Sequence, residues 1–197
     1  MTIYWAIASE DELSEIVAEK LVRECDTDAE VAIRLRKGGN GYLRTNIEKF
    51  AQISARMPLL LLTDLDTYPC AGALMSEWLS ERVIPDRFNF RVCVREIEAW
   101  LMADRQNFAD LMEIPIARIP ANPDDLGDPK QALLDLARGG SRAIRSDLLV
   151  QRGAIASQGL GYNRRLCEFV ADRWDIDHAA ANSGSLRRAV ARLKALG

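Results

Sequence analysis

The first half of the chain alternates between two hydrophobic patterns. Short runs of strand-forming residues predict four β-strands, over residues 2–8, 29–35, 59–62 and 88–94. Apolar residues at helical spacing follow each run and predict helices, over residues 13–25, 43–55, 70–82 and 96–103. The four leucines of the third run are typical of a strand buried on both faces of a parallel sheet. This repeated order predicts an α/β fold, with a doubly wound parallel sheet and helices on both faces.

The second half of the chain lacks strand signals. After residues 112–129, which hold four of the seven prolines, helical patterns cover residues 129–138 and 163–196. We therefore expect one domain, with an α/β core over residues 1–104 and a helical C-terminal extension over residues 105–197 that packs on the core as a cap. Residues suited to begin helices in this extension are Asn163, Ser183 and Ser185.

Charge and reactive side chains narrow the function. With 26 Lys and Arg against 29 Asp and Glu, the chain has a net charge of -3 and lacks the basic excess typical of broad nucleic-acid binding. Its four cysteines are far apart and His178 is the only histidine, which argues against a Cys/His zinc site and against Ser-His or Cys-His catalysis. The sequence starts without a signal-peptide pattern and contains no apolar run long enough to span a membrane, so we expect a cytoplasmic protein with no membrane partner.

Three carboxylates follow two of the predicted strands. Glu10 comes after the first strand, and Asp64 and Asp66 come after the third. In an open parallel sheet, functional groups gather at the carboxyl ends of the strands, and the aspartates of a D-x-D motif can point to the same side of an extended chain. We therefore expect them to bind Mg²⁺ or Mn²⁺, which can bridge phosphates and activate water. The alternative is that each acid only caps a helix or solvates a loop.

Glu98 is the fourth candidate carboxylate. It follows the fourth predicted strand, where it could reach the same metal or orient a metal-bound water. We assign it an assisting catalytic role. The alternative is a carboxylate in the first turn of a helix, where it interacts favourably with the helix dipole.

Basic residues suited to hold a phosphate surround the glycine-rich stretch KGGNG at residues 37–41. Backbone N–H groups of such a loop can cradle a phosphate, although the stretch lacks the ending of a P-loop. The candidate substrate-binding residues are Arg36, Lys37 and Arg44 around this stretch, together with Lys130, which begins a helix of the extension and could approach the site from the cap. The alternative for the stretch is a plain turn, and the alternative for Lys130 is an ordinary surface residue. The final helix has a basic face of its own, which is either only solvated or contacts nucleic acid. The basic face of the final helix comprises Arg187, Arg188, Arg192 and Lys194.

Several longer segments carry a family resemblance. They are AIASEDELSE, KGGNGYLRTNI, LLLTDLD, FRVCVREIEAWLMADR, DPKQALLDLA, GYNRRLCEFVADRWD and SGSLRRAVARL. The chain resembles Toprim-like proteins, in which a glutamate after the first strand and a D-x-D after a later strand bind magnesium. More closely, it resembles a bacterial Toprim-like domain-of-unknown-function family over nearly its whole length. Related proteins are often encoded beside ATPases of the overcoming-lysogenization-defect type, in defence or mobile elements.

The resemblance implies a Toprim-like core and a metal site formed by Glu10, Asp64 and Asp66. It also implies a nuclease, or a partner of a nuclease, that acts against phage or mobile DNA, with nucleic acid as substrate. No tyrosine is placed as a topoisomerase nucleophile, so hydrolysis by water is the simpler chemistry. A second hypothesis is a non-catalytic subunit that pairs with an ATPase. A third is a receiver-like or nucleotide-binding domain with Asp64 as phosphate acceptor, although no lysine follows a late strand as that chemistry requires.

Overall fold

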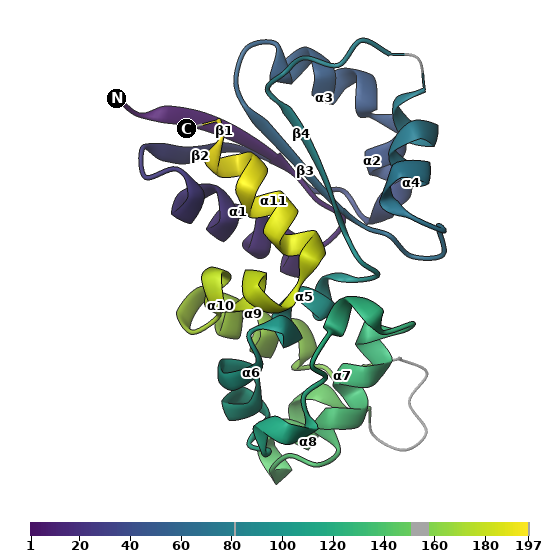
Figure 1. Ribbon diagram of the computed structural model, residues 1–197, viewed down its shortest axis with the longest axis vertical. Coiled ribbons are helices and arrows are strands. Elements are labelled where there is room, and N and C mark those ends of the chain that lie inside the picture. The colour runs from purple at the N-terminus through teal and green to yellow at the C-terminus, as the bar shows by residue number, and fades with distance from the viewer. Residues whose placement is uncertain (81, 151–157, 197) are drawn as a thin grey trace. The chain divides into compact units, whose positions relative to one another are not determined.

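One parallel sheet organises the first half of the protein. The computed structural model describes residues 1–80, 82–150 and 158–196. All neighbouring strands run parallel, in the order β2-β1-β3-β4, which confirms the predicted α/β class with a parallel sheet (Figure 1). The strands are β1 (Ile3–Ala8), β2 (Ala29–Leu35), β3 (Leu59–Asp64) and β4 (Phe88–Cys93).

The leucine run forms the buried centre of the sheet. All four side chains from Leu59 to Leu62 are inaccessible to solvent, as expected for a strand covered on both faces. Leu59 and Leu61 belong to a core that also contains Phe50 and Trp78. Because side chains alternate along a strand, Leu60 and Leu62 point to the opposite face.

Helices cover both faces of this sheet (Figure 1). Helices α2 (Gly39–Thr45), α3 (Ile47–Ser54) and α4 (Ala71–Leu79) lie on one face, and α1 (Glu12–Cys25) lies on the other. The apolar residues of α1 recur at helical spacing, so its buried stripe faces the sheet. Asp11 caps this helix by accepting the Ser14 N–H at 2.8 Å.

The helix expected over residues 43–55 is wrong as a single element. Helix α2 starts within the glycine-rich stretch, and Asn46 separates it from α3. The Asn46 side chain donates to the Tyr42 carbonyl at 2.8 Å, a local bond that competes with a continuous helix. Gly38 and Gly39 have φ angles of 82° and 77°, a conformation that favours glycine.

The chain forms two compact units. The sheet unit comprises Met1–Val94 and Arg187–Gly197, and the helical unit comprises Arg95–Leu186. These bounds differ from the predicted core and extension, and their assembly as one capped domain stays a prediction. The helical unit contains α5 (Ile97–Ala103), α6 (Arg105–Met112), η1 (Ile116–Arg118), η2 (Pro123–Asp125), α7 (Pro129–Ala137), α8 (Arg142–Leu148), α9 (Tyr162–Asp172) and α10 (Ile176–Asn182). Helix α11 (Gly184–Lys194) starts in the helical unit, and most of its residues belong to the sheet unit.

Helix α5 is the centre of the helical unit. All seven of its residues are buried, and the Trp100 indole N–H donates to the Ser185 hydroxyl at 2.7 Å. Ser183 fulfils its predicted role because its hydroxyl accepts the Leu186 N–H at the start of α11. The predicted cap at Asn163 is wrong, since α9 already begins at Tyr162. Within the described part of the chain, no helix has the length and apolar character needed to cross a membrane.

Candidate functional site

The carboxyl ends of β1 and β3 meet where the strand order reverses. The chain passes from β1 to β2 on one side and then crosses to β3 on the other. Ala8 of β1 is the register partner of Leu61 of β3, so the segments after these strands lie at the same edge of the sheet. Open α/β sheets bind ligands at such a switch point. Glu10 and Asp64 are therefore located where the fold favours a binding site.

Glu10 is bound directly to the end of β3. Its Oε1 atom accepts the Asp64 backbone N–H at 3.1 Å and also accepts the Thr63 hydroxyl. Among the described residues, none binds the second carboxylate oxygen, Oε2. Thr63 is buried, so its hydroxyl is fixed toward the glutamate rather than toward solvent.

The surroundings of Glu10 disfavour its negative charge. Burial raises the pKa of Glu10 above its ordinary value of 4.5, while the hydrogen bonds from Thr63 and Asp64 oppose that rise. The carboxylates of Asp66 and Asp11 raise the pKa of Glu10 further. Both charged neighbours that shift this pKa are thus acidic, an arrangement that a bound cation would stabilise.

The glycine-rich stretch is connected to this cluster at two points. The Gly39 N–H donates to the Glu10 carbonyl at 3.1 Å, and the Asn40 side chain donates to Asp66 Oδ2 at 3.1 Å. Asp66 itself has a φ of 49°, a left-handed conformation that aspartate tolerates better than most residues. The Leu65 N–H donates to the Cys93 carbonyl at 2.9 Å and anchors the turn on β4. Sequence reasoning missed Asn40 and Thr63.

The three predicted metal ligands do not form a preassembled shell. Among the residues described, no group of three or more His, Cys, Asp or Glu side chains is arranged to hold a metal ion. Magnesium is often held by only one or two protein carboxylates and keeps several waters. Glu10 and Asp66 are compatible with that smaller donor set, because Glu10 has an available oxygen and Asp66 is oriented by Asn40. The ligand assignment for Glu10, Asp64 and Asp66 stays a prediction.

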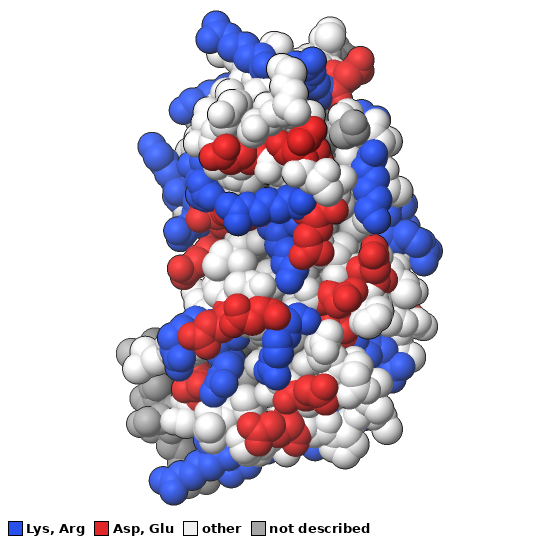
Figure 2. Space-filling view, turned by 90° about the vertical axis from the view of Figure 1, so that its left-hand side faces the viewer, with Lys and Arg blue, Asp and Glu red and all other residues white. Residues whose placement is uncertain are grey.

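Two of the candidate phosphate-binding residues form ion pairs. Arg36 pairs with Glu15 at 3.2 Å, and Arg44 pairs with Glu77 at 2.8 Å. Figure 2 shows that basic and acidic residues are interspersed on one face of the protein, where Lys and Arg side chains lie among Asp and Glu side chains. Exposed pairs of this kind contribute about 0–1 kcal/mol, so a phosphate can compete for the arginines. Lys37 is exposed just after β2.

Glu98 and Lys130 belong to the helical unit. Glu98 is buried in the first turn of α5, where its Oε1 accepts the Tyr162 hydroxyl at 2.7 Å. Burial raises the pKa of Glu98 above its ordinary value of 4.5, and the bond from Tyr162 opposes that rise. The Lys130 ammonium lies 5.3 Å from the centroid of the Tyr162 ring, and the Lys130 backbone N–H donates to Glu96 at 2.8 Å. Tyr162 was not recognised from the sequence.

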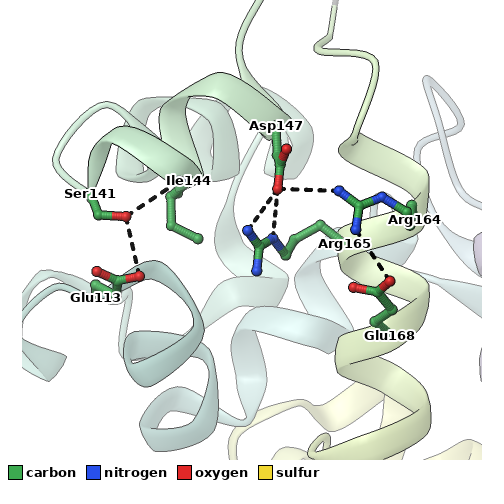
Figure 3. A network of polar contacts seen from close by, with 7 residues as sticks. All are labelled: Glu113, Ser141, Ile144, Asp147, Arg164, Arg165 and Glu168. Atoms are coloured by element: carbon green, nitrogen blue, oxygen red, sulfur yellow. Dashed lines mark hydrogen bonds and ion pairs between the residues drawn. The ribbon is translucent and has the colours of Figure 1, made fainter.

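A second polar network joins α8 to α9 (Figure 3). Asp147 accepts two hydrogen bonds from Arg165, at 2.6 and 3.0 Å, and one from Arg164 at 3.4 Å. Arg164 also pairs with Glu168 at 3.3 Å. Because Asp147, Arg164, Arg165 and Glu168 each have an oppositely charged partner, we interpret these pairs as a structural connection between the two helices.

Comparison of the chain with protein-family models, curated proteins and solved structures found no match. The resemblance to Toprim-like proteins therefore stays an expectation.

Proposed function

We propose that the sheet unit hydrolyses phosphodiester bonds of nucleic acid with Mg²⁺ or Mn²⁺ at the Glu10, Asp64 and Asp66 cluster. One observation carries the proposal: a half-buried glutamate at the sheet's switch point is hydrogen-bonded to β3 and has further carboxylates as its charged neighbours. Such a site stabilises a divalent cation, and a cation of this kind can bind a phosphate. The resemblance supports the same chemistry, along with a Toprim-like fold and a role in defence within the cytoplasm.

Each residue of the cluster has a distinct part in this proposal. When bound, Mg²⁺ would neutralise charge on the phosphate and lower the pKa of a water molecule. Thr63 and the Asp64 N–H hold one oxygen of Glu10, which leaves the other for the ion. Asn40 orients Asp66 toward the same edge. The basic residues Arg36, Lys37 and Arg44 would hold substrate phosphates, whereas Glu98 and Lys130 of the helical unit are not part of the proposal.

The test is a cleavage assay with matched acidic substitutions. Purified protein is incubated with supercoiled, linear and single-stranded DNA and with RNA, with Mg²⁺, with Mn²⁺ or with EDTA. Glu10→Gln and Asp64→Asn remove charge at the cluster, and Glu30→Gln removes an exposed charge at the start of β2, on the opposite edge of the sheet. We expect metal-dependent cleavage that falls by more than about 100-fold in the first two variants, since loss of an outer partner alone costs 10–100-fold.

The same assay distinguishes the other hypotheses. Cleavage that continues in EDTA and in both cluster variants contradicts the catalytic proposal. Metal binding without cleavage of any substrate favours a non-catalytic partner of an ATPase. A mass increase at Asp64 with a small phosphoryl donor favours the receiver-like hypothesis, for which Asp64 at the end of β3 is the relevant observation.

A further inference from the structure

Arg91 lies on β4 in an environment that does not neutralise its charge. Its strand neighbours Phe90 and Val92 belong to the apolar core on one face of the sheet, so alternation directs Arg91 to the other face. The residue is half-buried, and its Nε atom is fully covered and has no hydrogen-bond partner among the described residues. A buried donor without a partner is unfavourable, because it has given up its hydrogen bonds to water.

Asn89 adds a second unsatisfied group on the same face of β4. The residue is fully buried, and its Nδ2 donates to the Arg87 carbonyl at 3.2 Å. Its Oδ1 accepts no hydrogen bond from the described part of the protein. An acceptor and a donor, two residues apart on one strand, thus both lack a partner among the described residues, so this face of β4 is polar and not internally neutralised.

A second arginine lies close to this group. Arg192 of α11 donates from Nη2 to the carbonyl of Asp86, two residues before β4, at 3.1 Å. Burial lowers the pKa of Arg91 from its ordinary value, and the neighbouring charge of Arg192 lowers it further. No ion pair joins either arginine to a described carboxylate, in contrast to Arg36 and Arg44.

We propose that Arg91 and Arg192 form a binding site for a phosphate group, either free or in a nucleic-acid backbone. Two guanidinium groups offer planar donor forks that match phosphate oxygens, and the anion would relieve their mutual repulsion. The basic face of α11 continues with exposed Arg188, so a polyanion has further contacts. This site does not depend on the proposed catalysis.

The test measures stabilisation of the full chain by phosphate in EDTA at constant ionic strength. The midpoint of thermal unfolding is recorded with chloride or inorganic phosphate, and binding of a labelled single-stranded oligonucleotide is measured by fluorescence anisotropy. Arg91→Met removes the half-buried charge while keeping a long apolar side chain, and Arg192→Gln changes an exposed residue without disturbing the core. Arg56→Gln is the matched control, because Arg56 is an exposed arginine after α3 in the same unit.

We expect phosphate, the oligonucleotide or both to bind the unmodified protein and Arg56→Gln. The affinity of Arg91→Met and of Arg192→Gln for the same probe should be about 10-fold lower than that of the unmodified protein. Without phosphate, Arg91→Met should unfold at a higher temperature than the unmodified protein, because a half-buried charge without an ion-pair partner has been removed. Binding of the oligonucleotide alone identifies a nucleic-acid backbone as the source, and binding of phosphate alone identifies a free anion. Equal binding by all four proteins, or binding of neither probe, would overturn the proposal.

Discussion

The Glu10 carboxylate accepts the backbone N–H of Asp64 at 3.1 Å, which joins two acidic segments 54 residues apart in the chain. The bond connects the second residue after β1 to the last residue of β3, at the point where the sheet order reverses. It fixes one carboxylate oxygen of Glu10 and leaves the other for a ligand. The candidate site is therefore positioned by the sheet itself, with the glycine-rich stretch attached to it through Asn40.

Substitution of Thr63 by valine should weaken the site while keeping the shape of the side chain. Thr63→Val removes the hydroxyl that holds Glu10, which costs about 1 kcal/mol of unfolding free energy. Loss of this bond also raises the pKa of Glu10. Protons therefore compete with Mg²⁺ for the carboxylate up to a higher pH in the variant than in the unmodified protein. Urea unfolding with and without Mg²⁺ measures both effects. Thr27→Val, at an exposed position after α1, is the control and should change neither.

Substitution of Asn40 by aspartate should make the protein more dependent on a cation. Asn40→Asp replaces the amide that donates to Asp66 with a second negative charge beside it. We expect lower stability in EDTA and a larger increase in the unfolding temperature on addition of Mg²⁺ than in the unmodified protein, because bound ligand stabilises the folded state. An identical Mg²⁺ effect in the two proteins would show that no cation binds beside Asp66. Asn122→Asp, an exposed position in the helical unit, is the control.

Glu98 should cause a loss of stability as pH rises. Its pKa is raised in the folded state, so below its ordinary value of 4.5 both the folded and unfolded states hold the proton. As pH rises from 4.5 through the folded-state pKa, the unfolded state loses its proton first, and the folded state is destabilised relative to it. Glu98→Gln should lack this loss. Urea unfolding from pH 4 to pH 8 should show a gap in favour of the variant that widens as pH rises above 4.5, whereas parallel curves would contradict the burial of an ionisable Glu98.

Tyr162 should stabilise the ionised form of Glu98. Tyr162→Phe removes the hydroxyl that donates to Glu98 at 2.7 Å and leaves a buried carboxylate without that partner. We expect a loss of about 1–3 kcal/mol at pH 7, measured by urea unfolding. The loss should be much smaller in a Glu98→Gln background, because a neutral amide needs the hydroxyl less than a carboxylate does. Equal losses in both backgrounds would show that the hydrogen bond from Tyr162 does not stabilise the negative charge of Glu98.

Local patterns predict the elements of this fold better than the contacts between them. The leucine run from Leu59 to Leu62 identifies a central parallel strand, because four consecutive apolar residues indicate a strand that is buried on both faces. The positions of Glu10 and Asp64 follow from the same pattern, since strand ends determine the edge of the sheet. The pairing of Asn40 with Asp66 and of Tyr162 with Glu98 could not be predicted, because each joins segments far apart in sequence and depends on tertiary packing. The break at Asn46 was missed for a different reason: a side-chain bond to the backbone overrides an otherwise helical pattern.

Calorimetric titration of Mg²⁺ into the unmodified protein, Glu10→Gln and Glu30→Gln tests the proposed metal site most directly. Glutamine keeps the oxygen that accepts from Thr63 and Asp64 but removes the charge that a hard cation requires. We predict a binding isotherm for the unmodified protein and for Glu30→Gln, and a loss of binding in Glu10→Gln. Equal Mg²⁺ affinity in all three proteins, or no binding in any of them, would contradict a metal site at the carboxyl ends of β1 and β3.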